Sequence, residues 1–305
     1  MDEPEAGARF DCFGGSCTAL VSGAGDAGPA QAAVEMVRRR LQGWHTRFSR
    51  FLPDSELSRV NGNPAREVGV SPLMARLAQA VHMAGSLTAG LVDATLIDEI
   101  ETAGYATDLG RPLDLARALE LAPERRPAGG SRSAGWRQIA VDVAAGTLQR
   151  PAGVKLDSGG LGKGLFADVL GEVLAGHGAF AVGCGGDLAI GGSAGLTRAI
   201  KVESPFDGSI LHTFERQRTG VATSGIGRRS WLDDSGRPAH HLLDPATGRP
   251  AFTGVVQVTA LAPSALLAEV YAKAAILSGP HGACAWLPHG GVIVCDDGSH
   301  EVLGR

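Results

Sequence analysis

Apolar residues recur with helical spacing in four stretches of the 305-residue chain. In the first stretch, residues 30–44, Val34, Val37, Leu41 and Trp44 form one apolar stripe opposite a run of arginines. Such a stripe is typical of a helix that packs one face against a core. The same spacing predicts three further helices, which cover residues 71–88, 163–175 and the segment that follows 264.

Residues with capping preferences mark where these helices begin and end. Ser71 is placed as an N-cap before Pro72, and Gly90 follows the predicted end of that helix. Ser264 is the corresponding cap of the last helix. The apolar positions of the third and fourth helices, which we expect to face the core, are Leu165, Phe166, Val169, Leu170, Val173 and Leu174, and then Leu266, Leu267, Val270, Tyr271 and Ala274.

Strand-like segments outnumber the predicted helices and often follow one another directly. They cover residues 136–143, 147–149, 178–184, 195–203, 220–223, 255–261 and 292–295, and the first two flank Ala-Ala-Gly, a plausible hairpin. This order predicts an α+β fold with mixed or antiparallel sheets and flanking helices rather than a doubly wound sheet.

No second independent core is evident along the chain, so we expect residues 1–305 to form one domain. The polar segment 123–135, rich in Pro, Gly and Arg, predicts a mobile loop within it.

Composition narrows the class of protein. The 28 Lys and Arg against 32 Asp and Glu leave no basic excess for binding nucleic acid. The acidic N-terminus does not resemble a signal peptide, and no apolar run approaches the roughly 20 residues that span a bilayer. The five cysteines include no Cys-x-x-Cys pair and are odd in number, which is typical of reduced thiols rather than of a disulfide framework or a zinc site. We therefore expect a cytoplasmic protein without a membrane span.

Glycine is abundant, at 44 residues, and clustered. One cluster, LDSGGLGKG at residues 156–164, lies between an apolar segment and the third predicted helix. Its glycines let the backbone approach a ligand, the helix N-terminus offers free N–H groups, and Lys163 adds a positive charge. This combination suits a phosphate, although the spacing matches neither a Walker loop nor a dinucleotide fingerprint. A tight strand-to-helix turn without a ligand is the alternative.

A second glycine cluster, GCGGD at residues 183–187, follows the same helix. The order of strand, loop, helix, strand and loop predicts that Asp157 and Asp187 reach the same edge of the sheet. Carboxylates there could bind a metal or ribose hydroxyls, or could cap turns without any ligand.

The segment HHLLDPATG at residues 240–248 carries two adjacent histidines. On a strand they point to opposite faces, so one of them at most faces a site. Such a histidine beside a pyrophosphate is a natural general base at neutral pH, whereas an isolated histidine is more often structural.

Taken in order, these motifs resemble those of the ApbE family of FAD:protein FMN transferases. The resemblance covers about residues 45–280 and rests on SELSRVN at 55–61, AGLVDAT at 89–95, LDSGGLGKG, GCGGD, ATSG at 222–225, HLLDPATG at 241–248 and Ala268-Glu269. Each motif is weak alone, but their shared order is specific. The resemblance implies cleavage of the FAD pyrophosphate with Mg²⁺, and attachment of FMN through a phosphoester to Thr or Ser of an acceptor flavoprotein, with release of AMP.

The resemblance also assigns residues. It implies that His241 is the catalytic base and that the Gly160 carbonyl and Glu269 are metal ligands. It places the contacts to FAD at Phe51, Asp93, Asp157 and Lys163.

The last helix departs from the family pattern Ala-Asp-x-x-x-Thr, because this chain has Glu269 and Lys273 at the two metal-shell positions. Magnesium prefers oxygen ligands in octahedral geometry, and an ammonium group is not one. Either Glu269 and Gly160 hold the metal with extra water, or Lys273 replaces part of its charge. Three functions stay open at this point: transferase, FAD pyrophosphatase with water as acceptor, and non-catalytic flavin-binding protein.

Overall fold

A large antiparallel sheet forms the centre of the protein in the computed structural model, which describes residues 5–107, 109–110 and 112–304. The order of its strands is β1-β2-β6-β7-β10-β15-β16-β17, and every neighbouring pair is antiparallel. The strands are β1 (Ala6–Cys12), β2 (Gly15–Ser22), β6 (Ala179–Cys184), β7 (Asp187–Gly191), β10 (Thr219–Gly225), β15 (Val255–Ala262), β16 (Gly291–Cys295) and β17 (His300–Leu303).

Smaller sheets surround it. Three short strands pair in the order β3-β5-β4, and three two-stranded ladders join β8 with β9, β11 with β12 and β13 with β14. Their bounds are β3 (Glu67–Gly69), β4 (Ala140–Asp142), β5 (Thr147–Gln149), β8 (Arg198–Glu203), β9 (Ile210–Arg216), β11 (Ser230–Leu232), β12 (Pro238–His240), β13 (Leu243–Asp244) and β14 (Arg249–Pro250).

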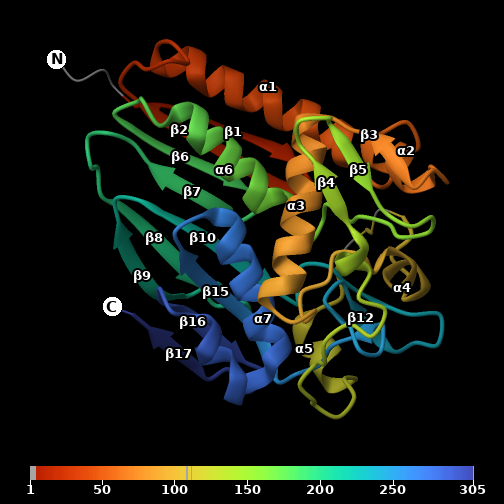
Figure 1. The fold of residues 1–305 in the computed structure, drawn as a ribbon. Helices are drawn as coiled ribbons and strands as arrows, with labels where there is room; N and C mark the ends of the chain where they lie inside the picture. Colours follow the sequence, from red (N-terminus) through yellow and green to blue (C-terminus); the bar gives the residue numbers. More distant parts are fainter. Residues whose placement is uncertain (1–4, 108, 111, 305) are drawn as a thin grey trace.

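Three of the long helices pack against the central sheet (Figure 1). Helix α1 lies on β1 and β2, α6 on β6 and β7, and α7 on β10 and β15, while α6 and α7 also contact each other. Helix α7 is interrupted at Gly279, directly before Pro280. The helices are α1 (Ala30–Phe48), α2 (Glu56–Gly62), α3 (Pro72–Leu87), α4 (Ile97–Thr102), α5 (Leu115–Glu120), α6 (Gly162–Leu174) and α7 (Ala265–Ala283), with 3₁₀ turns at Gly135–Gln138 and Cys284–Trp286.

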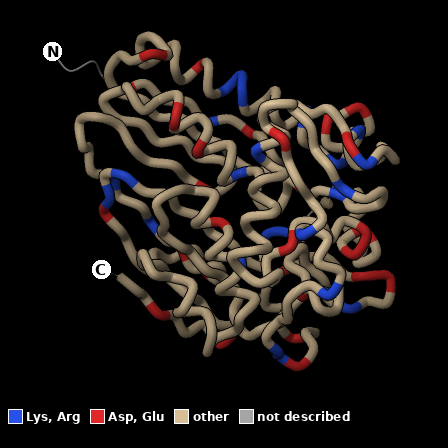
Figure 2. Tube along the Cα trace, viewed as in Figure 1, with Lys and Arg blue, Asp and Glu red and all other residues tan. Residues whose placement is uncertain are grey.

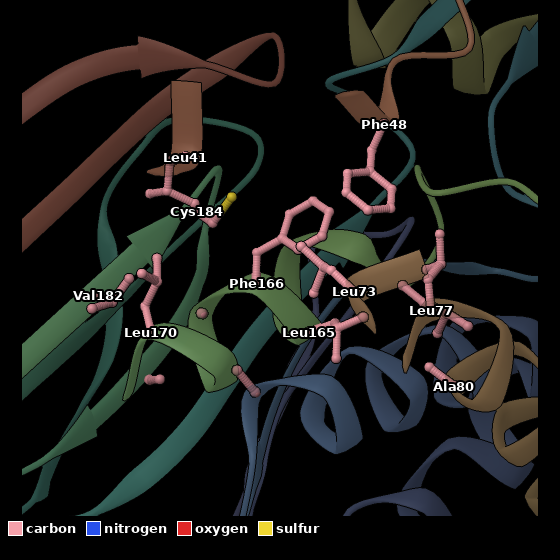
Figure 3. Packing of buried hydrophobic residues seen from close by; sticks show 14 of the residues in the cluster. Leu41, Phe48, Leu73, Leu77, Ala80, Leu165, Phe166, Leu170, Val182 and Cys184 are labelled. Carbon is pink, nitrogen blue, oxygen red and sulfur yellow. The ribbon is translucent and has the colours of Figure 1, made fainter. Parts of the chain in front are cut away.

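The apolar face of α6 fills the space between the sheet and helices α1 and α3. Figure 3 shows Leu170 directed at Val182 of β6, and the Phe166 ring lying toward Phe48 of α1. The two rings are 5.1 Å apart, and Leu170 is fully buried. This contact brings the N-terminal end of α6 and the C-terminal end of α1 together, and both ends later prove to border the same cavity.

The structure confirms the α+β class and the antiparallel sheets. Helices 3 and 4 of the prediction are α6 and α7, and Ser71 and Ser264 cap their helices by accepting hydrogen bonds from Met74 N–H and Leu267 N–H. Helix α1 extends four residues beyond the predicted stripe, to Phe48.

Several local predictions were wrong. Trp136 starts no strand but lies in a 3₁₀ turn, and the hairpin is shorter than expected, with β4 and β5 of three residues each. The apolar faces predicted for the third and fourth helices also include residues that do not belong to the core. These residues are only half-buried: Val169, Val173, Leu266, Leu267 and Tyr271.

The segment 123–135 is irregular, as predicted, but backbone hydrogen bonds attach it to other elements. Arg126 N–H donates to Phe252 O (2.9 Å) and Ala128 N–H to Leu277 O (2.8 Å). Its mobility stays a prediction. So does the one-domain organisation, which is supported by α7, since this helix contributes buried residues to both large core clusters.

Basic and acidic residues are scattered along the trace (Figure 2), and in this view neither sign occupies a face of its own. Within the described residues, no helix combines the length and apolarity that crossing a membrane requires.

The packing of α6 gives a matched stability test. Leu170→Ala should lower the free energy of unfolding by about 2–5 kcal/mol, because a fully buried leucine leaves a cavity against β6. Val169→Ala, one residue earlier and half-buried, should cost clearly less. Chemical denaturation of both variants measures the difference, and equal losses would contradict the packing described for this helix.

Candidate functional site

A cavity of about 550 Å³ opens where the loop before α6 meets the end of α1. This volume is within the range of small-molecule sites. Its wall is assembled from segments far apart in sequence, namely residues 13–14, 45, 48–52, 91–94, 105, 109–110, 112, 157–160, 163, 166, 228–230, 241–243, 245, 273 and 277, among others.

Backbone hydrogen bonds and one side chain of the loop, that of Asp157, hold the shape of the glycine loop. Asp157 N–H donates to Ala94 O (2.9 Å), and Asp157 Oδ1 accepts from Gly159 N–H (2.9 Å). Gly162 N–H then donates to Ser158 O (2.7 Å), which starts α6. Asp157, Gly160 and Lys163 all reach the cavity wall from this turn.

Helix α6 approaches α7 closely at Gly164. A Cβ atom at this position would lie 2.7 Å from Ala265 O and 2.8 Å from the Leu266 Cα atom. Glycine is therefore required because the first turn of α6 touches the first turn of α7. Gly164 N–H donates across this contact to Glu269 Oε2 (3.0 Å).

Beneath the cavity lies a buried cluster of four charges, which we call the charge cluster: Lys163, Asp187, Glu269 and Lys273. Lys163 is paired with Asp187, and its Nζ lies 3.3 Å from Glu269 Oε1. Lys273 Nζ donates to the same Oε1 atom (2.9 Å). Both carboxylates are 0 % exposed, whereas both lysines belong to the cavity wall.

Burial and pairing act in opposite directions on these groups. Burial favours the neutral acid at Glu269, but Lys163 and Lys273 outweigh it, so the pKa of Glu269 is lowered. Burial raises the pKa of Asp187 to about 7 despite Lys163. Burial also opposes the charge on Lys163, yet Asp187 and Glu269 raise its pKa above the usual range. Glu269 and Lys163 are therefore charged at neutral pH.

The two adjacent histidines have different surroundings. His240 ends β12 and is buried, with its Nδ1 accepting from Leu242 N–H (3.3 Å) and its ring 4.7 Å from that of Phe252. Burial lowers the pKa of His240 to about 3. His241 follows the end of the strand rather than lying on it, and it borders the cavity.

His241 is a neutral imidazole. Burial lowers its pKa well below 6.5, and Arg229, His240 and Lys273 lower it further. Its backbone N–H donates to Arg229 O (3.2 Å), while Nδ1 is buried without a partner among the described residues. A neutral, unpartnered imidazole at a cavity wall is able to accept a proton.

An aromatic and cationic stack forms the rim of the cavity. The Arg50 guanidinium lies 4.3 Å from the Phe51 ring centroid and 4.5 Å from that of Tyr105. Phe51 is exposed at 38 %, so its ring is available to a planar ligand. Asp93 adds an acidic side chain to the wall. Its Oδ1 accepts hydrogen bonds from Thr95 N–H and Thr95 Oγ1, and its Oδ2 is buried without a partner among the described residues.

The structure thus gathers most of the residues chosen from the sequence. Phe51, Asp93, Asp157, Gly160, Lys163, His241 and Lys273 all line the cavity. Two acids do not. Asp187 and Glu269 are fully buried below the lysines, so of the roles left open for Asp187 the structure favours pairing with Lys163 over direct contact with a ligand.

Sequence reasoning missed several charged and aromatic residues of the wall, among them Arg50, Tyr105, Arg228 and Arg229. The signal for Arg50 was its position next to Phe51. Arg228 and Arg229 are two adjacent arginines that follow shortly after the ATSG motif, and this run of positive charge was the available signal. Nothing in the local sequence points to Tyr105, because tertiary packing alone brings it to Phe51.

Comparisons with known proteins point in one direction. The model of the ApbE family matches residues 13–295. A protein from Vibrio cholerae named FAD:protein FMN transferase is 26 % identical over 278 residues, which are 87 % of this chain and 80 % of that protein.

Two crystal structures share the fold. The ApbE protein of Thermotoga maritima has a TM-score of 0.79 at 24 % identity, with 98 % of this chain and 97 % of that chain covered. The apo flavinyl transferase ApbE of Pseudomonas stutzeri has a TM-score of 0.77 at 21 % identity, with 99 % and 96 % covered.

The contact between α6 and α7 is testable with one kind of substitution at two helical glycines. Gly164→Ala should destabilise the protein by about 1–3 kcal/mol, because its Cβ would overlap the backbone of α7. Gly43→Ala in α1 has no atom within 4 Å of the added Cβ and should stabilise by about 0.5–1 kcal/mol. Thermal and denaturant unfolding compare the two, and a neutral Gly164→Ala would contradict the close approach.

Proposed function

The chain belongs to the ApbE family, and we propose that it transfers the FMN half of FAD to a Ser or Thr hydroxyl of an acceptor flavoprotein, releasing AMP. The observation that carries this proposal is the single cavity in which a neutral His241 and two lysine ammonium groups face the same space. The names of the matched relatives support the same reaction.

The cavity offers complementary groups for each part of FAD. The exposed ring of Phe51, beside Arg50 and Tyr105, suits stacking with the planar isoalloxazine. Lys163 and Lys273 suit the pyrophosphate oxygens. Asp157 and the orphaned Oδ2 of Asp93 accept hydrogen bonds from ligand N–H or O–H groups.

The reaction needs one proton acceptor and a means of stabilising negative charge. We propose that the His241 imidazole takes the proton of the acceptor hydroxyl as its oxygen attacks the phosphorus of the FMN half. A new P–O bond forms, and the bond between this phosphorus and the bridging oxygen breaks, with the electron pair leaving on AMP. The ammonium groups stabilise the charge that builds on the phosphoryl oxygens.

The same steps with water as the nucleophile would release free FMN and AMP. The transferase and the pyrophosphatase therefore share one site and differ in the acceptor. A protein that binds FAD without cleaving it would use the ammonium groups but not His241.

The donor set does not fit a magnesium ion bound by α7. Both Glu269 oxygens are occupied, by Lys163, Lys273 and Gly164 N–H, and an ammonium group stands at position 273. A cation at this position would meet two positive groups instead of a free carboxylate. We therefore propose no step through a metal, and Gly160 and Glu269 act as wall and charge-cluster residues. The cytoplasmic location stays a prediction.

His241 should be essential for turnover but not for binding. His241→Ala should lower AMP release from FAD at least ~10²-fold, the usual contribution of a general base, with FAD affinity nearly unchanged. His212→Ala, in β9 outside the cavity wall, is the matched control and should be silent. Chromatographic detection of AMP and calorimetric FAD titration measure the two effects. Full activity of His241→Ala would overturn its role as base.

The pH dependence follows from the lowered pKa of His241. A base must be neutral, and a histidine whose pKa lies well below 6.5 stays neutral as the solution is acidified to that value. Protonation of His241 should therefore not lower kcat/KM for AMP release between pH 8 and 6.5, and its acid limb should lie below pH 6.5, whereas Asp187, with a pKa of about 7, can change FAD binding within that range. An acid limb that belongs to His241 and is centred at or above pH 6.5 in the free enzyme would contradict the burial of this imidazole.

A further inference from the structure

Position 273 places a positive charge in the wall of the cavity. Lys273 is only 8 % exposed, yet its side chain borders the same space as Gly160 and Asp157. It lies one helical turn after Glu269 on α7, and its Nζ is held 2.9 Å from Glu269 Oε1. The ammonium group is therefore fixed in place rather than free to swing into solvent.

The charge cluster is arranged in two levels. Asp187 and Glu269 lie on the protein side, without exposure, and Lys163 and Lys273 lie on the cavity side. Two ammonium groups balance two carboxylates if all four are ionised. The cluster thus places its two ammonium groups toward the cavity and its two carboxylates away from it.

Each of the remaining carboxylates of the wall has one oxygen engaged, while Asp93 Oδ2 is buried without a partner among the described residues. Asp93 Oδ1 accepts from Thr95 and Asp157 Oδ1 accepts from Gly159 N–H, and each acid shapes its own turn. Among the described residues, no group of three or more His, Cys, Asp or Glu side chains has the geometry to hold a metal ion. Arg228 and Arg229 add further positive charge to the wall.

We propose that the Lys273 ammonium takes the place of a divalent cation, so that this protein binds the pyrophosphate of its dinucleotide without Mg²⁺. Ammonium groups form charge-assisted hydrogen bonds to phosphate oxygens without imposing octahedral geometry. Glu269 serves to position Lys273 and Lys163 and not to ligate a metal. This inference rests on the proposed function in one respect: it takes FAD as the ligand that carries the pyrophosphate.

The first test uses the unmodified protein. FAD and riboflavin are titrated by calorimetry and flavin fluorescence in EDTA and again in excess Mg²⁺. We expect FAD affinity to change less than about threefold between the two conditions, and to exceed riboflavin affinity by at least about tenfold in EDTA, since only FAD carries the pyrophosphate. Mn²⁺ titrated into the protein–FAD complex should bind no more tightly than it binds free FAD.

The second test removes the charge. Lys273→Met keeps the length of the side chain and should lower FAD affinity in EDTA at least about tenfold while leaving riboflavin affinity unchanged. Lys201→Met, an exposed lysine in β8, is the matched control and should be silent in both titrations. Thermal unfolding checks that Lys273→Met folds, and the titrations of the unmodified protein decide the question even if it does not.

The outcomes separate the two proposals. FAD binding that requires Mg²⁺, or tight binding of Mn²⁺ to the complex, would overturn the ammonium proposal and leave the flavin transferase proposal intact. Lys273→Met with unchanged FAD affinity in EDTA would also overturn it. A protein that binds no FAD in either condition would instead contradict the proposed function.

Discussion

The pairing of two fully buried carboxylates with two lysines is the interaction on which the site depends. Asp187 begins β7, Lys163 lies in the first turn of α6, and Glu269 and Lys273 belong to α7. Removing one partner of such a buried pair typically costs about 3–5 kcal/mol, because a charge is left without compensation. The cluster therefore fixes the positions of three elements relative to one another, and it does so directly under the cavity.

Backbone contacts prepare the geometry that these charges need. Asp168 of α6 accepts hydrogen bonds from Ala265 N–H (2.7 Å) and Leu266 N–H (2.9 Å), so α6 caps the N-terminus of α7. Gly220 of β10 allows the same end of α7 to lie on the sheet, since a Cβ there would fall 2.0 Å from the Ser264 carbonyl carbon. With its first turn held on both sides, α7 directs residues 269 and 273 toward Lys163.

Local sequence signals predicted the parts of the fold that local physics decides. Apolar spacing and the Ser71 and Ser264 caps located the long helices, because periodicity and capping act within a few residues. Strand order could not be predicted in the same way, because it depends on contacts between distant segments. Strand β2 pairs with β6, for example, so that Cys17 lies opposite Cys184. Motifs found Asp157, Lys163 and His241, but the burial of Asp187 is set by the pairing of β7 with β6 and β10, which no motif records.

Position 273 illustrates why a motif and a site differ. In isolation, Glu269 and Lys273 are an ordinary i,i+4 pair of the kind that surface helices use for a few tenths of a kcal/mol. Helix α7 instead turns the pair inward, where Glu269 loses all contact with solvent and shares one oxygen between two ammonium groups. In that environment the residue type at position 273 matters: an ammonium group there, in place of the threonine hydroxyl of the family pattern, adds a positive charge to the cavity wall. The chemistry of the site is consequently determined by the network around the motif as much as by the motif itself.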